Sequence, residues 1–539
     1  MDPFASALEH AAALSRGDYS SEELTRVYLD RIERLNPDLN HYVLVTADLA
    51  LELAQGAGKG ALQGVPVSIK DLSSLAGYPT TFGSRALASL VLPYDAYVVA
   101  RLKEAGCPIL GKTNTSEFGN RPVTEHGLFG AARNPWNLEH TTGGSSGGAA
   151  GAVAAGLCAF AQGSDGGGSV RIPSSCCGVV GLKPTRGVIS SGPVFGEGWA
   201  GLATDGVITR TVADAAAALD AVAGHLPGDP FWAELDPQSR PRPLRVAFTT
   251  EAAAAVQPEV AEAVRRVART IEGLNHEVEE VGPDTAAFRG PMVVVVVAGM
   301  ASLPLPPGAE LEPFNVASVL AGNQVSGPDY LRAVGTIREH SRRVVGFWDK
   351  RDVLVTPTLT RTAPLIGTLG ANLETASEEY LDWLSFTYPY NCTGQPAISL
   401  PLAMSGDGLP IGVQLVGPPR GEKTILGLAA ELESALPWKE RRPERPGGWP
   451  RAGSAEHGRQ GGPPQPGDRQ GGDLQRPGRR ARGQARDRPL RRLRCAGDRG
   501  PEPRSRARDL RRERPPGRRG AEAKPGGART GRTRPGRDR

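Results

Sequence analysis

The chain has 539 residues and a mass of 56.7 kDa, which is long for one simple core and predicts a large domain or several domains. Its net charge of +5 conceals two parts of opposite character: residues 441–539 carry 29 Arg and one Lys against 11 acidic residues, whereas the first 440 residues carry 33 basic and 47 acidic residues. This composition, with 39% hydrophobic residues, excludes a small disulfide scaffold, a collagen-like fibre and a wholly disordered chain.

The N-terminal part of the chain alternates helix signals with short apolar runs. Residues 20–23 (SSEE) are typical of a helix N-terminal cap, and they precede an amphipathic helix predicted over 24–35. Pro37 is expected to end that helix. Residues 64–71 have the pattern of a short buried strand that finishes on Lys70.

The same alternation continues along the chain. A helix is predicted over 96–105 with Gly106 as its C-terminal cap, followed by a strand over 108–110. Later signals predict a helix over 149–156, strands over 158–162, 352–355 and 397–400, and a last helix over 424–436. Alternation of this kind predicts an α/β fold, with a sheet that has helices on both faces.

The end of the chain differs from the rest in composition. Residues 441–539 contain 33 Gly or Pro and a single aromatic residue, Trp449. Such a segment cannot bury enough apolar surface to offset its conformational entropy, so residues 443–539 are predicted to be a disordered basic tail. GC-rich DNA encodes Arg, Gly, Pro and Ala in almost any frame, and a non-native or frameshifted origin of this tail stays open.

Cysteine usage and apolar runs indicate the cellular compartment. The six cysteines are irregularly placed and form no CxxC pair, so neither a disulfide framework nor a metal site is expected. The first nine residues include acids and lack the features of a signal peptide. The longest aliphatic block, 293–297, is far shorter than the ~20 residues of a membrane helix. We therefore expect a soluble, cytoplasmic protein with no membrane partner.

Residues 106–113 (GCPILGKT) match the phosphate-loop pattern GxxxxGK[ST] letter for letter. The chemistry of that loop requires a strand before its first glycine and a helix that begins at the Lys-Thr pair. Here the predicted order is a helix, the Gly106 cap and then a strand, which would use the loop amides in a sheet. We interpret the match as accidental and expect no nucleotide.

A first glycine-rich segment, residues 143–148 (GGSSGG), surrounds Ser145 and Ser146 with four glycines. Glycine permits backbone conformations that are closed to other residues, so an unusual loop is expected. A flexible linker is an alternative, but its position directly before an Ala-rich helix inside a domain argues against it. A nest of amides that binds phosphate is the other alternative.

A second glycine-rich segment, residues 163–173, places Ser169 at a strand-to-helix junction, where a nucleophile would be well presented. Successive backbone amides of Gly166, Gly167, Gly168 and Ser169 can converge on one point, as an oxyanion hole requires. On either side of Ser169 lie two charged residues, Asp165 and Arg171, that we interpret as a structural ion pair. A direct role of this pair in contacting substrate is the alternative.

A nucleophilic serine needs a base, and the eight histidines include none in a recognisable catalytic setting. A Ser-His-Asp triad stays open, because its members need not be near in sequence. Lys70 is the other candidate, because it ends an apolar strand where loss of hydration would lower the pKa of its amine. The alternative for Lys70 is a surface lysine with its stem along the protein.

These segments together resemble the amidase signature family. The resemblance rests on VSIKDL at 67–72, the GGSSGG block and GGSVRIP at 167–173, with Ser169 placed 24 residues after Ser145. It continues through GKTNT at 111–115, RNPWN at 133–137, GVVGLKPTRG at 178–187 and YNCTGQPAIS at 390–399. It implies an amidase domain over 1–442 with a large mixed central sheet covered by helices on both faces. Within the family, the sequence is most similar to the bacterial amidases that include 6-aminohexanoate cyclic-dimer hydrolases.

The resemblance also implies a role for individual residues. Ser169 would be the nucleophile, Ser145 would follow a cis peptide bond and bridge Ser169 to Lys70, and Lys70 would be the neutral base. The amides from Gly166 to Ser169 would form the oxyanion hole. Gly166 departs from the family pattern, in which a side chain such as that of Thr or Ile is usual; this departure would loosen the loop and leave the amide available.

These roles imply an amidase that hydrolyses linear or cyclic carbon–nitrogen amide bonds through a serine acyl-enzyme, without peptide specificity and without a cofactor. Its partner would be a small-molecule amide, and a homodimer stays open. The pocket walls are expected to come largely from loops, several of them within residues 285–345.

Two alternative functions stay open. The glutamine-hydrolysing component of a tRNA-dependent amidotransferase shares the family pattern, but Ile172-Pro173 stands here where Gln-Pro is usual in that component. Binding of nucleic acid through the basic tail would follow from its net charge of +19. The lack of aromatic residues for stacking on bases argues against a nucleic-acid partner.

Overall fold

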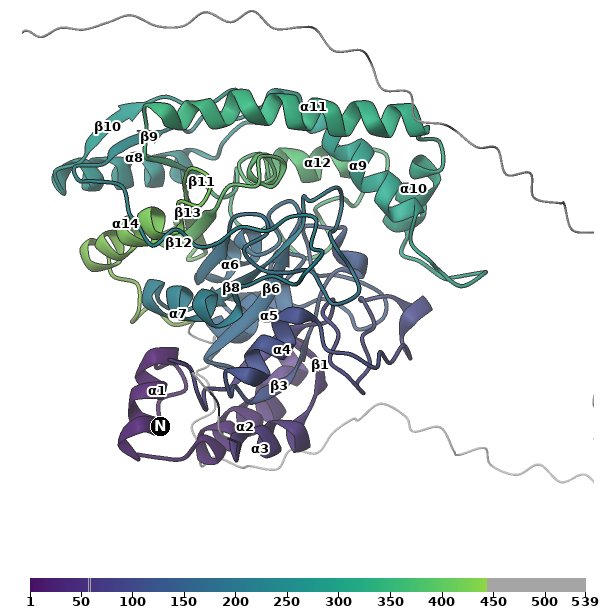
Figure 1. Cartoon of the computed structure of the whole chain (residues 1–539), viewed down its shortest axis with the longest axis vertical. Coiled ribbons are helices and arrows are strands. Elements are labelled where there is room, and N and C mark those ends of the chain that lie inside the picture. Colours follow the sequence, from purple (N-terminus) through teal and green to yellow (C-terminus); the bar gives the residue numbers. More distant parts are fainter. Residues whose placement is uncertain (57, 59, 444–539) are drawn as a thin grey trace, which may run out of the picture. The chain divides into compact units, whose positions relative to one another are not determined.

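The computed structural model describes residues 1–443 apart from residues 57 and 59. Its centre is one large sheet (Figure 1). The strands of this sheet span, in chain order, β1 Tyr42–Val45, β2 Val67–Lys70, β3 Ile109–Thr113, β6 Phe160–Asp165, β7 Val180–Lys183, β8 Thr204–Thr209, β9 Arg245–Phe248, β10 Glu277–Glu280, β11 Val353–Pro357, β12 Ala397–Met404 and β13 Pro410–Val416. Two short strands, β4 Arg133–Asn134 and β5 Asn137–Thr141, pair separately.

The large sheet is eleven-stranded and mixed, with the order β1-β3-β2-β6-β8-β7-β12-β13-β11-β9-β10. Strands β3, β2 and β6 are parallel neighbours, as are β11, β9 and β10. All other neighbours in the sheet are antiparallel. The mixed α/β sheet expected from the sequence is confirmed.

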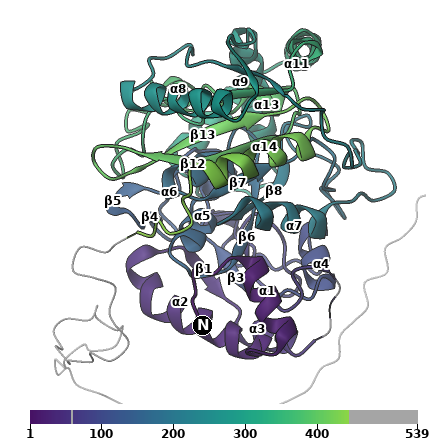
Figure 2. The ribbon, with the colours of Figure 1, turned by 90° about the vertical axis from the view of Figure 1, so that its left-hand side faces the viewer.

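Helices cover both faces of this sheet. Every residue of β2, β3 and β7 is buried, as in strands that are packed on both sides. Helix α5 packs against α6, whereas α7 packs against α4 and α14 (Figure 2). The helices of the described residues are α1 Ala7–Arg16, α2 Ser21–Leu39, α3 Ala47–Ala54, α4 Tyr97–Glu104, α5 Gly147–Ala154, α6 Arg171–Cys177, α7 Val212–Val222, α8 Pro258–Gly273, α9 Arg289–Ala301, α10 Pro313–Gly322, α11 Gly327–Val345, α12 Ala376–Trp383, α13 Pro389–Cys392 and α14 Glu422–Ala435.

Helix α2 begins as the sequence predicts and ends differently. The Ser20 hydroxyl accepts the Glu23 backbone N–H, and the Glu23 carboxylate accepts that of Ser20, which completes a capping box. The prediction that Pro37 ends the helix is wrong, because the helix runs to Leu39. A proline in the last turn removes one backbone hydrogen bond only, and Asn40 in the left-handed conformation ends the helix instead.

The residues of the phosphate-loop match form ordinary structure, as expected. Gly106 follows α4 with φ +78°, in the left-handed conformation of a helix cap. The next residues enter β3, and Lys112 within that strand is fully buried with its Nζ 2.7 Å from Asp71 Oδ1. Burial lowers the pKa of Lys112, while the charge of Asp71 opposes that change.

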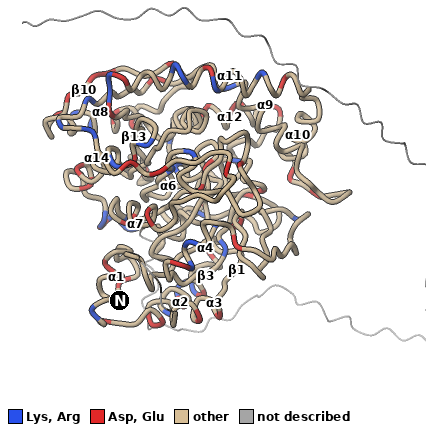
Figure 3. Tube along the Cα trace, in the orientation of Figure 1, with Lys and Arg blue, Asp and Glu red and all other residues tan. Residues whose placement is uncertain are grey.

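Residues 285–345 are mostly helical, with an irregular segment over 302–312, and not the set of loops that we expected. Pro313 opens α10 in the first turn, and the Ser326 hydroxyl caps α11 by accepting the Asp329 N–H. Charged residues of both signs occur along α11 (Figure 3). None of the helices in the described part of the chain is long and apolar enough to cross a membrane. The tail predicted from residue 443 onward lies, after its first residue, outside the described residues.

Candidate active site

The three candidate catalytic residues come from three neighbouring segments. Lys70 is the last residue of β2, Ser145 precedes α5, and Ser169 lies between β6 and α6. Because β2 and β6 are parallel neighbours, their carboxyl ends lie at the same edge of the sheet. The backbone N–H of Ser146 donates to the Ser169 carbonyl over 3.1 Å and joins the two serine loops. The structure therefore brings all three predicted residues to one place.

The amine of Lys70 lies among hydroxyl groups. Its side chain is fully buried, with Nζ 2.7 Å from Ser145 Oγ and 3.0 Å from Ser164 Oγ. Among the described residues Lys70 has no ion-pair partner. A hydroxyl can donate to a neutral amine as well as accept from a charged one, so these contacts suit either protonation state of Lys70.

Burial lowers the pKa of Lys70 from 10.5 to about 7, because the charged amine loses its hydration. The negative charges of Asp165 and Asp205 oppose this shift without cancelling it. At neutral pH a large fraction of Lys70 is then uncharged, which a proton acceptor requires. The direction is the one expected from the position of Lys70 at the end of an apolar strand.

The backbone before Ser145 has the feature that the family resemblance implied. The peptide bond between Gly144 and Ser145 is cis. Ser145 itself is 1% exposed, whereas Ser169 is 9% exposed and lines the pocket described below. The Ser169 hydroxyl has no hydrogen-bond partner among the described residues, so it is available to a substrate.

The glycine loop after β6 leaves three of the four expected amides available. The Gly168 N–H donates to Asp165 Oδ1 over 2.8 Å, so this amide is already used. The N–H groups of Gly166, Gly167 and Ser169 have no partner among the described residues. Gly168 has φ +135°, a conformation that favours glycine and turns the chain toward Ser169. Of the four amides expected to form an oxyanion hole, those of Gly166, Gly167 and Ser169 therefore remain as candidates.

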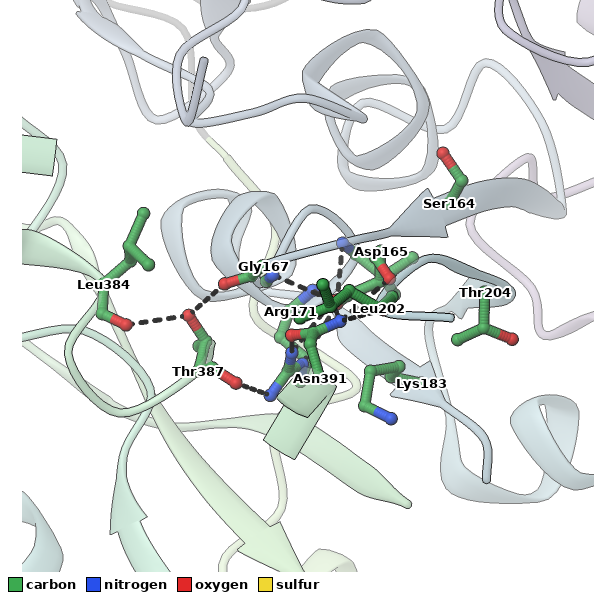
Figure 4. Close-up of polar contacts among 12 residues, drawn as sticks. Ser164, Asp165, Gly167, Arg171, Lys183, Leu202, Thr204, Leu384, Thr387 and Asn391 are labelled. Atoms are coloured by element: carbon green, nitrogen blue, oxygen red, sulfur yellow. Dashed lines mark hydrogen bonds and ion pairs between the residues drawn. The ribbon is translucent and has the colours of Figure 1, made fainter. Parts of the chain in front are cut away.

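A buried ion pair between Asp165 and Arg171 supports the glycine loop after β6 (Figure 4). Arg171 and Asp165 are both fully buried, with Nη2 2.8 Å from Oδ1. Burial alone would raise the pKa of Asp165, but the charge and hydrogen bonds of Arg171 lower it well below its usual range. Asp165 also accepts the N–H groups of Gly168 and Val170. The interpretation of this pair as structural agrees with these contacts.

Two further residues hold the glycine loop and its ion pair: Thr387, just before α13, and Asn391, within α13. The sequence analysis gave neither of them a role. The Thr387 hydroxyl donates to the Gly167 carbonyl over 2.7 Å, and Asn391 Nδ2 donates to the Asp165 carbonyl over 2.9 Å. Asn391 Oδ1 in turn accepts from Arg171 Nη2 at 2.7 Å. The motif YNCTGQPAIS at 390–399, which is part of the family resemblance, was the available signal for Asn391.

A pocket opens at Ser169 and is largely apolar. Its polar lining includes Asn120, Arg121 and Tyr380, with Arg121 Nε donating to the Tyr380 hydroxyl over 2.9 Å. The apolar walls come from α6, α9, α10 and α12 and from the loop before β8: Ile172, Trp199, Met292, Val293, Val296, Val297, Phe314, Leu381 and Leu384. A ligand that reaches Ser169 therefore meets mainly hydrocarbon side chains.

Histidine takes no part in this arrangement within the described residues. None of the seven described histidines hydrogen bonds to Ser145 or Ser169; His41, for example, contacts the Arg133 carbonyl, and His126 contacts Asn114. The described residues also contain no cluster of three or more His, Cys, Asp or Glu side chains placed to hold a metal ion.

Comparison with known proteins places this geometry in context. The sequence model of the family described as Amidase matches residues 23–426. The 6-aminohexanoate-cyclic-dimer hydrolase of Paenarthrobacter ureafaciens is 38% identical over 481 residues, which cover 82% of this chain and 97% of the relative. A solved structure of 6-aminohexanoate cyclic dimer hydrolase with substrate superposes with a TM-score of 0.79 at 37% identity, covering 82% of this chain and 99% of that one. A component of the glutamyl-tRNA(Gln) amidotransferase from Thermotoga maritima gives a TM-score of 0.67 at 29% identity, with 84% and 98% covered.

Proposed function

The chain belongs to the amidase family, and we propose that it hydrolyses amides through an acyl-enzyme on Ser169, with Ser145 and Lys70 as the proton relay. The enzyme is an amide hydrolase of the amidase signature type. The observation that carries the finer proposal is the contact of 2.7 Å between Lys70 Nζ and Ser145 Oγ beside a serine with an unpaired hydroxyl. We assign Ser169, Ser145 and Lys70 to the nucleophile, the bridging group and the base of such a relay.

In the proposed acylation, Ser169 Oγ attacks the carbonyl carbon of the amide. The Ser169 proton passes to Ser145 Oγ, and Ser145 passes its own proton to the neutral amine of Lys70. The carbonyl oxygen becomes an oxyanion, which the N–H groups of Gly166, Gly167 and Ser169 are available to stabilise.

Collapse of this intermediate breaks the carbon–nitrogen bond. The proton held by Lys70 returns through Ser145 to the leaving nitrogen, which departs as an amine. The ester of Ser169 is then cleaved by water, whose proton passes to the same relay and back to Ser169. The products are a carboxylic acid and an amine, and all three side chains return to their starting state.

We infer the substrate class from the pocket. Its mainly hydrocarbon walls favour amides with apolar groups next to the reacting carbonyl. Linear and cyclic amides both fit this description, and the relative from Paenarthrobacter ureafaciens is named for a cyclic dimer. A panel of short alkyl amides, aryl amides and cyclic oligoamides, analysed for acid and amine products, tests this part of the proposal.

The nucleophile is tested with a fluorophosphonate that labels activated serines. The wild type should incorporate one label per chain, and Ser169→Ala should abolish it. Ser174→Ala is the matched control, because Ser174 is a buried serine on α6, the helix that follows Ser169, and its hydroxyl donates to the Val170 carbonyl. Equal labelling of Ser169→Ala and wild type would show that the nucleophile is another residue.

The alternative of glutamine hydrolysis for a tRNA amidotransferase has less support. The amidotransferase component matches this chain at 29% identity, against 37% for the cyclic-dimer hydrolase structure. Hydrolysis of glutamine to glutamate that is faster than the hydrolysis of apolar amides would favour that alternative. The alternative of nucleic-acid binding through the tail concerns residues outside the described part of the chain and is untested.

A further inference from the structure

The indole of Trp199 occupies the space beside two glycines that belong to different elements. A Cβ atom at Gly166, in the glycine loop, would lie 2.7 Å from Trp199 Cζ3 and 2.9 Å from Cε3. A Cβ atom at Gly299, on α9, would lie 2.7 Å from Trp199 Cδ1 and 3.0 Å from Nε1. Non-bonded carbon atoms prefer about 3.5–4.0 Å, so the ring leaves no room for a side chain at either glycine.

The turn that presents Trp199 has an unusual backbone. Trp199 and Ala200 have φ values of +53° and +55°, in the left-handed region. This region costs roughly 1–2 kcal/mol for a residue with a Cβ atom. Two hydrogen bonds close the turn: Gly201 N–H donates to the Glu197 carboxylate, and Leu202 N–H donates to the Trp199 carbonyl. A costly local conformation at a pocket is the kind of strain that accompanies a functional constraint.

The turn is also hydrogen bonded to Asn391, one of the residues that hold the glycine loop. The Leu202 carbonyl accepts Asn391 Nδ2 over 3.0 Å, and the same Asn391 contacts Asp165 and Arg171 (Figure 4). The Trp199 ring and the Gly166 amide are therefore held by one connected set of contacts, and the ring faces the pocket that contains Ser169.

From this geometry we infer that Trp199 is a specificity-determining residue. Its ring lies beside Gly166 and forms the part of the pocket wall that selects amides with an extended apolar acyl chain. The inference rests on the proposed amide hydrolysis at Ser169. A flat ring directly beside the glycine loop gives hydrocarbon contact to the carbons that follow the reacting carbonyl. Gly166 and Gly299 carry no side chain because the ring occupies that volume.

The first test measures selectivity with acetyl and hexanoyl anilides. Trp199→Ala should raise KM for the hexanoyl substrate and lower the ratio of hexanoyl to acetyl kcat/KM by about tenfold. Equal effects of Trp199→Ala on both substrates would mean that the ring is structural only, and would overturn the inference.

The second test uses the steric relation itself. Gly166→Ala and Gly299→Ala should each reduce kcat/KM for the acetyl substrate, which does not reach the indole, and adding Trp199→Ala to either variant should restore part of that loss. Gly167→Ala is the matched control, because its Cβ atom would meet Met292 Cε at 3.0 Å and not the indole, so Trp199→Ala should not rescue it. Absence of rescue for both Gly166→Ala and Gly299→Ala would overturn the inference.

A third measurement separates failure of this inference from failure of the proposed function. All variants are labelled with a small fluorophosphonate, and their thermal unfolding is recorded. Trp199→Ala should still be labelled at Ser169 and should unfold cooperatively. If wild-type Ser169 is not labelled, the proposed function fails first; if labelling is intact and selectivity is unchanged in Trp199→Ala, only the role of Trp199 is wrong.

Discussion

The protonation of Lys70 gives the sharpest quantitative prediction. With its usual pKa of 10.5, about one lysine in 3,000 would be neutral at pH 7, whereas a pKa of about 7 makes about half of the molecules competent. Burial of Lys70 therefore raises the reactive fraction about 1,500-fold at that pH. Because the base must be neutral to accept a proton, acylation should rise tenfold per pH unit below about pH 6 and level off above about pH 8.

The assay is single-turnover acylation from pH 5 to 10 in wild type, Lys70→Ala and Lys70→Arg. Lys70→Ala should lose several orders of magnitude, because no other base contacts Ser145 among the described residues. Lys70→Arg should not recover the rate, because a guanidinium stays charged throughout this range. A near-native rate for Lys70→Arg, or a flat profile for the wild type, would refute the assignment of Lys70 as the base.

Two further predictions concern stability and the tail. Arg171→Met should lower the free energy of unfolding in urea by about 3–5 kcal/mol, because it leaves the fully buried Asp165 without its partner. Adding Asp165→Asn should recover part of this loss, and a fully additive effect would contradict the pairing. Deletion of residues 445–539 should leave kcat/KM and the thermal midpoint unchanged, because their composition cannot build a core. Precipitation or loss of turnover in the truncated protein would contradict that prediction.

The parts of the site that could be predicted from sequence depend on local patterns. Lys70 closes a short strand with a mainly apolar pattern, so its burial at a strand end follows from the strand assignment. Ser145 and Ser169 lie in glycine-rich segments whose unusual backbone is visible in the composition itself. The order of the strands then decides that these segments meet, and no local signal in the sequence predicts that order. The family resemblance implied a mixed sheet and the roles of the three residues, without a strand order.

The parts that could not be predicted depend on contacts between distant segments. Whether the Gly168 amide is available depends on the rotamer of Asp165, which Arg171 and Asn391 fix. The volume beside Gly166 is filled by the ring of Trp199, a residue whose own φ is positive. Sequence periodicity carries no information about either arrangement, and the expectation of a loosened loop at Gly166 took no account of the ring that lies there.

A comparison of two buried lysines shows why the geometry, and not the pKa, identifies the base. Burial lowers the pKa of Lys183 to about 7, as it does for Lys70. Lys183 Nζ donates to the carbonyl oxygens of Pro184 and Gln395. Because a carbonyl oxygen has no proton to give, neither partner could protonate a neutral Lys183 amine. Lys70 instead contacts the Ser145 hydroxyl, which has a proton to give. Lys183→Met should therefore keep the pH midpoint of acylation in any protein that folds, and a shift of that midpoint would assign the titration to Lys183.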